Sequence, residues 1–343
     1  MRTAIKQALF HGARWSGLNA FSRRLRRDSL VVLNYHGVLD EANLRGADAN
    51  ISCNTVGSGE FAAHLEFLTR RYRPVRASDV EAWLAGERDL PPNALLLTFD
   101  DGLRNNLTHA APLLKRYGVP AILFLTTAYL GAQRLLWPQE LYELAMRWPR
   151  GEIPRPDAVE GFRLDGDRRL RSRKLVGLAK TLPAPMVEDW LKQLREEAPL
   201  PASLACNGFY AFLTWEEAAR LPGFGFELGS HTVNHWIVTR CTPEELRREL
   251  EESRSEIERR LGTACTSFCY PNGAAQDWSA ETAEAVKAAG YRAAYALPDR
   301  IQRRSPVNAY AIDRLMVAGG VSQAAFQARV SGVVEAVRAI LRP

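Results

Sequence analysis

The sequence lacks the cysteine patterns that mark disulfide-rich or metal-thiolate proteins. Its 343 residues include five cysteines, and none of them has CxxC spacing: Cys53, Cys206, Cys241, Cys265 and Cys269. An odd number without that spacing indicates neither a disulfide framework nor a thiolate zinc site. We therefore expect reduced thiols, as in a cytoplasmic protein.

Long apolar runs are also missing from the chain. No segment approaches the roughly twenty apolar residues of a membrane span, and the N-terminus has no continuous apolar core of signal-peptide length. Its basic cluster RRLRR, at residues 23–27, follows the apolar positions instead of preceding them. The sequence therefore predicts a cytoplasmic location, with neither a signal peptide nor a transmembrane span.

An excess of charge is absent except at the N-terminus. Residues 1–28 hold seven basic residues and one acidic residue, and this difference equals the net charge of +6 of the whole chain. Nucleic-acid binding usually needs a basic face on the folded body, so we expect no nucleic-acid partner. Two interpretations of this arm remain open. It could lie as an amphipathic helix on the anionic inner membrane face, or pack on the domain as a partly helical extension.

Most of the chain alternates short apolar runs with helical patterns. Apolar runs such as ALLLTF and PAILFL predict strands, whereas residues 242–262 have helical spacing, with Thr242 as N-cap and Gly262 as stop. Such alternation is typical of βαβ units around a parallel sheet or barrel.

The alternation lapses in the middle of the chain, and this lapse suggests a division into four parts. Residues 1–28 form the basic amphipathic arm, and residues 29–130 the first part of a (β/α) barrel. Residues 131–210 read as a mainly helical insertion, and residues 211–343 as the second part of the barrel with a C-terminal helix.

Three predicted strands end in polar side chains. TFDDG ends in Asp100 and Asp101, SHTVNH contains His231 and His235, and LNYHGV contains His36. Ligands of parallel β/α folds bind at the carboxyl ends of the strands, so these side chains can converge. Each motif also has an ordinary explanation, such as an aspartate that caps a helix or a histidine in a half-buried position.

Considered together, the motifs suggest a metal centre. Two histidines and one aspartate are a well-known ligand set for a divalent cation, with further positions open to water and substrate. A cation also explains the adjacent carboxylates of Asp100 and Asp101. It would compensate the charge of one and leave the other free to act as a base.

TFDDG, SHTVNH and FCYPNG, in this order, resemble the signature motifs of the polysaccharide deacetylases, carbohydrate esterase family four, with the NodB-homology fold. The resemblance covers roughly residues 30–320, apart from the insertion. It implies an α/β fold, a distorted (β/α) barrel with fewer than eight complete units. It also implies a metal-dependent hydrolase that removes N-acetyl groups from N-acetylhexosamine units of a polysaccharide or glycan intermediate.

By this resemblance, Asp101, His231 and His235 are the metal ligands, and Asp100 is the general base. Tyr270 of FCYPNG matches the residue whose backbone N–H binds the oxyanion. The expected cofactor is a divalent metal, with Zn²⁺ first and Co²⁺, Ni²⁺ or Mn²⁺ as alternatives.

The chain departs from the commonest family pattern in two places. No histidine follows His235 to act as a late general acid, and Cys269 stands where an arginine is usual. The branch that acts on poly-N-acetylglucosamine exopolysaccharides is similar to this chain instead, with its acid histidine near the N-terminus. LNYHGV and AIDRLMV resemble that branch, which implies His36 as general acid and Arg314 as the residue that orients Asp100.

Several alternatives remain open from the sequence. His36 could be a core histidine bonded to a backbone carbonyl, and Arg314 could equally pair with Asp313. The same fold could hydrolyse another small amide, because a fold does not fix the substrate. The chain could also be a catalytically silent glycan-binding protein of a polysaccharide-assembly system, although the retained Asp100 argues against pure binding.

Overall fold

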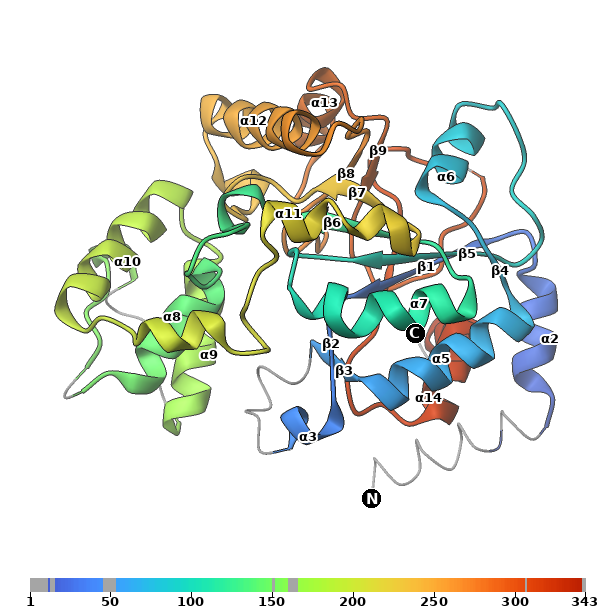
Figure 1. The fold of residues 1–343 in the computed structure, drawn as a ribbon, viewed down its shortest axis with the longest axis horizontal. Coiled ribbons are helices and arrows are strands. Elements are labelled where there is room, and N and C mark those ends of the chain that lie inside the picture. Colours follow the sequence, from blue (N-terminus) through green and yellow to red (C-terminus); the bar gives the residue numbers. More distant parts are fainter. Residues whose placement is uncertain are drawn as a thin grey trace.

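A parallel sheet forms the centre of the protein. The computed structural model describes residues 12, 16–45, 54–149, 152–159, 166–305 and 307–340. The main sheet has eight strands in the order β10-β1-β5-β6-β7-β8-β9, with β4 paired to β5 (Figure 1). Its strands are β1 (Leu30–Tyr35), β4 (Arg73–Pro74), β5 (Ala94–Phe99), β6 (Ala121–Leu125), β7 (Phe226–Ser230), β8 (Ser267–Cys269), β9 (Ala293–Tyr295) and β10 (Leu315–Met316). A separate pair joins β2 (Gly37–Leu39) to β3 (Thr55–Gly57).

One short stretch of chain joins the two edges of the main sheet. Tyr295 of β9 forms a parallel bridge with Ile312. Three residues later, Leu315 of β10 pairs in parallel with Leu33 of β1. The sheet is therefore curled, and residues 312–316 connect its edges. This confirms the predicted α/β fold with a distorted barrel.

The apolar run of β5 is continuous because both of its faces are covered. Leu95 and Leu97 lie in a cluster that includes Phe61 of the helix outside them. Ala94 and Leu96 lie in a second cluster with residues of the other strands, inside the curl. Since side chains alternate along a strand, the next two members of the inner series are residues 98 and 100.

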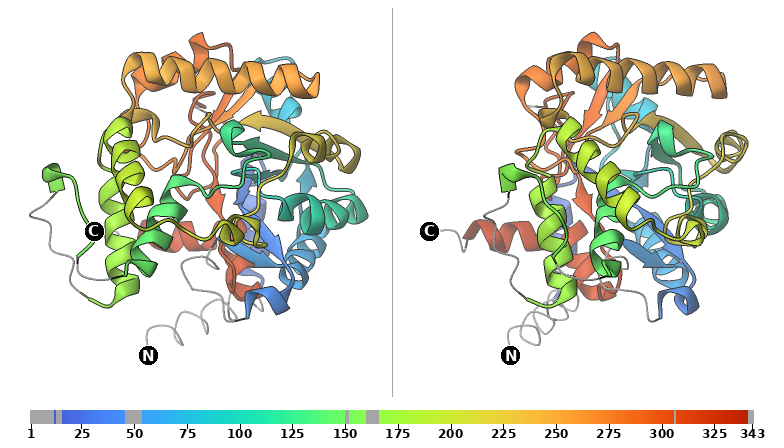
Figure 2. Two further views of the ribbon diagram at one scale, coloured as in Figure 1. Left: turned by 60° about the vertical axis from the view of Figure 1, so that its left-hand side comes forward. Right: turned by 90° about the vertical axis from the view of Figure 1, so that its left-hand side faces the viewer.

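Helices surround the sheet (Figures 1 and 2). They are α2 (Leu18–Leu25), α3 (Glu41–Leu44), α5 (Ser58–Arg71), α6 (Ala77–Leu84), α7 (Ala111–Tyr117), α11 (Trp215–Ala218), α12 (Pro243–Leu261), α13 (Ala280–Ala288), α14 (Gln323–Val330) and α15 (Val333–Ile340). The start and stop predicted for α12 are confirmed. The Thr242 hydroxyl accepts a hydrogen bond from the Glu245 N–H, and Gly262 ends the helix at φ 63°.

The middle of the chain forms a helical lobe beside the sheet, on the left of Figure 1. Within residues 131–210, the helices are α8 (Trp137–Arg147), α9 (Arg168–Ala179) and α10 (Ala184–Glu197). They enclose a core of their own, which contains Trp137, Trp148 and Trp190. We keep the name "insertion" for residues 131–210, as an interpretation of this lobe.

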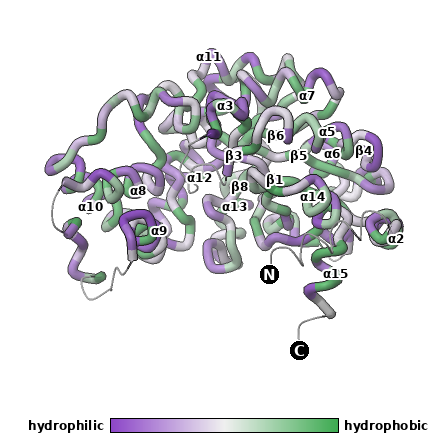
Figure 3. Tube along the Cα trace, turned by 90° about the horizontal axis from the view of Figure 1, so that it is seen from below, coloured by the Kyte–Doolittle hydropathy of each residue, from purple (hydrophilic) through white to green (hydrophobic). Residues whose placement is uncertain are grey.

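The described part of the N-terminal arm packs on the domain. Ser22 of α2 donates a hydrogen bond to the carbonyl of Ser331 at 2.8 Å, and Arg26 pairs with Glu335 of α15 at 2.9 Å. Helix α2 lies at the end of the molecule opposite the insertion (Figures 1 and 3). Residues 1–11 and 13–15 of the arm lie outside the described residues. Among the helices that the structure describes, none combines the length and apolar character that crossing a bilayer requires.

Candidate active site

The ends of β5 and β7 bring three potential metal ligands together. Asp101 follows β5, and His231 and His235 follow β7. Asp101 Oδ1 lies 3.6 Å from His231 Nε2 and 3.5 Å from His235 Nε2. The two imidazole rings are 4.9 Å apart and nearly perpendicular, at 72°. The structure therefore brings together the three residues predicted as ligands, from positions that are 130 residues apart in the sequence.

The backbone holds two of these residues in an unusual conformation. Asp101 and His235 have φ values of 77° and 61°, in the left-handed region that non-glycine residues rarely adopt. The loop around His235 is fixed by its neighbours: Thr232 Oγ1 accepts the His235 N–H at 2.9 Å, and Glu249 of α12 accepts the Val233 N–H at 2.8 Å. Such strain persists where the surroundings determine the conformation, and it is concentrated at functional sites.

The three ligand candidates fit a divalent cation. His231 Nδ1 lies 2.7 Å from the Cys269 carbonyl, which can only accept, so Nδ1 carries the proton and Nε2 offers its lone pair toward Asp101. Burial lowers the pKa of both His231 and His235, so both imidazoles are neutral near pH 7. The distances to Asp101 exceed those of hydrogen bonds. One carboxylate and two neutral imidazoles form a donor set that suits zinc and related first-row metals.

Asp100 continues the inner series of β5 and meets Arg314 inside the barrel. Arg314 donates to both carboxylate oxygens, at 2.8 and 2.9 Å, and Asn34 Nδ2 donates to Oδ2 at 2.7 Å. Asp100 is 3% exposed and Arg314 1%. Asp313 instead pairs with Arg300, so the alternative of an Arg314–Asp313 pair is not what the structure has.

These contacts keep Asp100 anionic. Burial alone would raise the pKa of the Asp100 carboxyl, but Arg314 foremost, together with His231 and His36, holds that pKa well below its usual range. For Asp101, burial is the dominant effect and raises the pKa. The adjacent carboxylates therefore have different surroundings: a guanidinium for Asp100, and two neutral imidazoles for Asp101.

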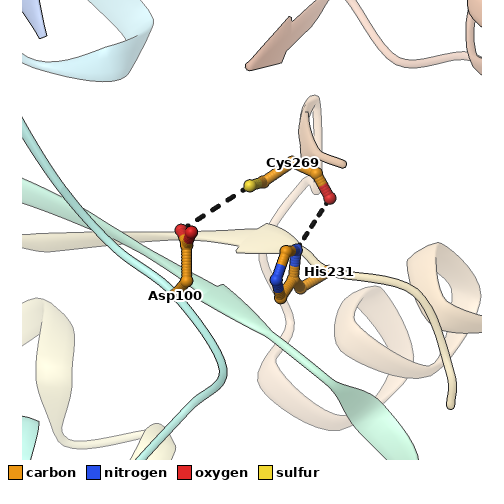
Figure 4. A group of neighbouring side chains, drawn as sticks. All are labelled: Asp100, His231 and Cys269. Carbon is orange, nitrogen blue, oxygen red and sulfur yellow. Dashed lines mark hydrogen bonds between the residues drawn. The ribbon is translucent and has the colours of Figure 1, made fainter. Parts of the chain in front are cut away.

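Cys269 stands where the resemblance to the deacetylase motifs led us to expect an arginine. It lies between Asp100 and His231, with its Sγ 3.6 Å from Asp100 Oδ1 and its carbonyl bonded to His231 (Figure 4). Asp100, His231 and Cys269 form a second group of possible ligands. This group is the weaker candidate, because both Asp100 oxygens already bind Arg314 and burial raises the pKa of the Cys269 thiol.

His36, at the end of β1, lines the same cavity as Asp101. This cavity has a volume of about 210 Å³. The Nδ1 atom of His36 is buried and makes no hydrogen bond to any described residue. The alternative of a core histidine bonded to a carbonyl through this atom therefore does not match the geometry.

Tyr270 does not have the free N–H expected of an oxyanion donor. Its N–H donates to the Tyr295 carbonyl at 3.1 Å, as the next hydrogen bond of the β8–β9 ladder. Its hydroxyl donates to the Tyr310 carbonyl at 2.9 Å. The assignment of the Tyr270 N–H to oxyanion binding is therefore wrong for this structure, because the residue still belongs to the sheet.

Three further contacts at the site were not predicted from the sequence. Asn34 binds Asp100, and the Trp137 indole N–H of the insertion donates to the His235 carbonyl at 2.9 Å. Lys180, also from the insertion, lines the cavity with His36 and Asp101. An asparagine inside the apolar run LVVLNY was a possible signal for the first contact. The other two depend on how the insertion docks.

The sequence model of the polysaccharide deacetylase family matches residues 87–156 and 182–294, together more than half of the chain. The protein belongs to this family. Asp100, Asp101, His231, His235 and Cys269 lie within the matched ranges, whereas His36, Lys180 and Arg314 lie outside them.

Individual relatives are distant. YxkH of Bacillus subtilis, named as a polysaccharide deacetylase, is 20% identical over 305 residues, which are 89% of this chain and 77% of YxkH. A de-N-acetylase structure from Aggregatibacter actinomycetemcomitans has a TM-score of 0.57 at 18% identity, covering 88% of this chain and all of that one. IcaB from Ammonifex degensii has a TM-score of 0.55 at 20% identity, covering 89% and 97%. At such identities, the structural likenesses show a shared fold.

Proposed function

We propose that the protein is a metal-dependent hydrolase that removes acetyl groups from N-acetylhexosamine units of a glycan. The observation that carries this proposal is the convergence of Asp101, His231 and His235 beside the anionic carboxylate of Asp100. Membership of the deacetylase family and the folds of the de-N-acetylase and IcaB support it.

The residues divide the reaction between them. Asp101, His231 and His235 would hold a divalent cation, which would supply Lewis-acid chemistry for the acetyl carbonyl and the attacking water. Asp100 accepts the proton of the attacking water, and the fixed Arg314 pair keeps its oxygens in one orientation.

His36 supplies the proton at the other end of the reaction. It lines the cavity from the β1 side and donates a proton to the amine as the C–N bond breaks. Water thereby provides the oxygen of acetate, and the sugar leaves as an amine.

Acetate release from N-acetylglucosamine oligomers tests the proposal. We expect a chelator to abolish release, and Asp100→Asn to lower kcat by about 10²- to 10⁴-fold, the usual value of a general base. Asp189→Asn, at an exposed carboxylate of α10, is the matched control and keeps wild-type activity. Chelator-insensitive release, or an active Asp100→Asn variant, would contradict the proposal.

The same assay separates the two alternatives. Hydrolysis of simple amides without hydrolysis of acetylated sugars would indicate another amidohydrolase. Binding of metal and oligosaccharide with no turnover at any pH would indicate a silent glycan-binding protein.

We also propose that α2 contacts an anionic membrane surface. Three of its apolar side chains, spaced along one side of the helix, are exposed: Leu18 (43%), Phe21 (60%) and Leu25 (71%). The last turn carries Arg23 and Arg24. Apolar side chains with neighbouring cations are the features of an interfacial helix.

Vesicle sedimentation tests this contact. We expect the full chain to sediment with vesicles that contain phosphatidylglycerol but not with pure phosphatidylcholine. Phe21→Ser combined with Leu25→Ser should lower binding more than tenfold, because each side chain contributes about 1.5–3 kcal/mol when buried. Leu170→Ser, at an exposed leucine of α9, is the control. Equal binding of the double variant would refute the contact.

A further inference from the structure

The cavity at the metal centre has two walls of different origin. The barrel contributes His36 and Asp101, and the insertion contributes Gln139 and Tyr142 from α8 with Val176 and Lys180 from α9 and its end. The family's sequence model skips residues 157–181, so α9 and Lys180 lie in a part of the chain that the model does not match.

The insertion wall is fastened to the loops that carry the site. The Trp137 indole N–H donates to the His235 carbonyl, and its ring stacks on Trp236 at 5.5 Å. Arg240 Nε donates to the Lys180 carbonyl at 3.3 Å. The Lys180 ammonium donates to Asn272 Oδ1, just after β8, at 2.6 Å. These contacts hold the insertion wall against the loops that carry the site.

Lys180 brings a positive charge to this wall with little to compensate it. Among the described residues, no carboxylate lies within ion-pair distance, 4.0 Å, of its ammonium, and its hydrogen-bond partner Asn272 is neutral. Burial lowers the pKa of Lys180, and Asp277 offsets this only in part. A largely buried cation without a paired anion is costly, so an anion placed in the cavity would be stabilised there.

The size of the cavity limits what can enter it. Its volume of about 210 Å³ is below the range of about 300–1,000 Å³ that drug-sized ligands occupy. One sugar ring with its acetamide is a ligand of suitable size for this volume. The cavity thus combines room for one sugar with a cation on the wall that faces the metal centre.

We propose that Lys180 recognises an anionic group, a carboxylate or a phosphate, on a single N-acetylated sugar that is held at the metal centre. This inference rests on the proposed function, and it specifies the substrate class of the same site. The charge of the sugar, not only its acetamide, would then decide which units the enzyme accepts.

Calorimetric binding to the metal-loaded full chain tests the inference without requiring turnover. The ligands are N-acetylglucosamine, N-acetylglucosamine 1-phosphate and N-acetylmuramic acid, which are neutral, phosphorylated and carboxylated. We expect at least one anionic sugar to bind tenfold or more tightly than the neutral sugar, and the better of the two identifies the group. In Lys180→Met this preference should fall to within twofold, and Lys180→Arg should retain part of it.

Lys192→Met, at an exposed lysine of α10, is the matched control and should keep the full preference. Because phosphate can also bind a metal directly, only the loss of preference in Lys180→Met supports the inference. Equal affinities in the wild type, no binding of any of the sugars, or a preference unchanged in Lys180→Met would overturn it.

The two proposals fail in different ways. An anion preference that depends on Lys180, without acetate release from any sugar, would refute the deacetylase function and leave the recognition site. Acetate release without any preference for an anionic sugar would leave the function and refute the recognition site.

Discussion

The barrel and the insertion both contribute walls to one cavity, but they hold their residues by different means. On the barrel side, Asp100 continues the alternation of β5 and is fixed by Arg314 across the interior. On the insertion side, Lys180 follows a helix that packs in a separate core and reaches the site through contacts with Arg240 and Asn272. We infer from this difference that the barrel side carries the proposed chemistry, whereas the insertion side carries the proposed recognition of the substrate.

The largest difference between the two walls is expected in the metal content of variants at Asp101 and Lys180. Asp101→Ala removes one of three converging ligands, so we expect the metal content to fall from one ion per chain toward zero and acetate release to be lost. Lys180→Met should keep its metal, because the ammonium is no ligand. Elemental analysis of both purified variants measures the metal content per chain. Metal loss from Lys180→Met would contradict the assignment of metal binding to the barrel wall alone.

Removing the guanidinium of Arg314 should have the next largest effect. Arg314→Met leaves Asp100 buried without its partner, which costs about 3–5 kcal/mol of unfolding free energy. Burial would then raise the pKa of Asp100, so kcat should fall at least about 10²-fold as the base becomes protonated. Chemical denaturation and kinetics measure the two effects.

Arg195→Met is the matched change in the insertion. Arg195 pairs with Glu140 but is 38% exposed, so we expect a loss of about 1 kcal/mol or less. A similar cost in both variants would show that burial does not distinguish the two regions.

Acid should destabilise the barrel more than the insertion. The buried His64 lies in the barrel, whereas the sequence has no histidine between residues 131 and 210. Burial lowers the pKa of His64 from 6.5 to about 4. As the pH falls below 6.5, the unfolded chain therefore binds a proton that the folded chain excludes. Stability is lost until the pH reaches about 4, by up to about 3 kcal/mol. Denaturation at several pH values measures this loss of unfolding free energy. We expect the loss to be smaller in His64→Leu than in the wild type. In His109→Leu, which changes a more exposed histidine, the loss should remain.

The smallest effect is expected where the two walls touch. Trp137→Phe removes the N–H that supports the His235 carbonyl, and such supporting contacts affect metal affinity by about 10-fold or more. Trp190→Phe is a matched control, since its indole N–H binds the Pro154 carbonyl within the insertion. Metal-competition titrations measure both, and equal affinities would show that the insertion does not support the metal loop.

Much of the barrel side could be predicted from the sequence. Strand alternation and the motifs identify Asp100, Asp101, His231 and His235, because these residues stand at strand ends or in the loops that follow them. The Arg314–Asp100 contact also followed from motif resemblance, and the structure places the two side chains together. The catalytic roles of these residues remain predictions.

Two features could not be predicted, for physical reasons. The Tyr270 N–H was misassigned because a motif does not show where the hydrogen-bond ladder ends, and β8 and β9 remain paired one residue beyond β8. Lys180 was not predicted, because it reaches the site only when α9 and the rest of the insertion pack beside the barrel. The sequence of α9 is rich in arginine and contains no motif that points to a site. Contacts made by residues of such packed helices can be identified only from the three-dimensional structure.

The stretch 312–316, which joins the two edges of the sheet, couples closure of the sheet to the charge of Asp100. Leu315 pairs with Leu33 of β1, and the neighbouring Arg314 donates to both carboxylate oxygens of Asp100. Opening of the sheet along this stretch would therefore also take the guanidinium away from a buried carboxylate. Because an unpaired buried charge is costly, Asp100 itself favours the closed sheet.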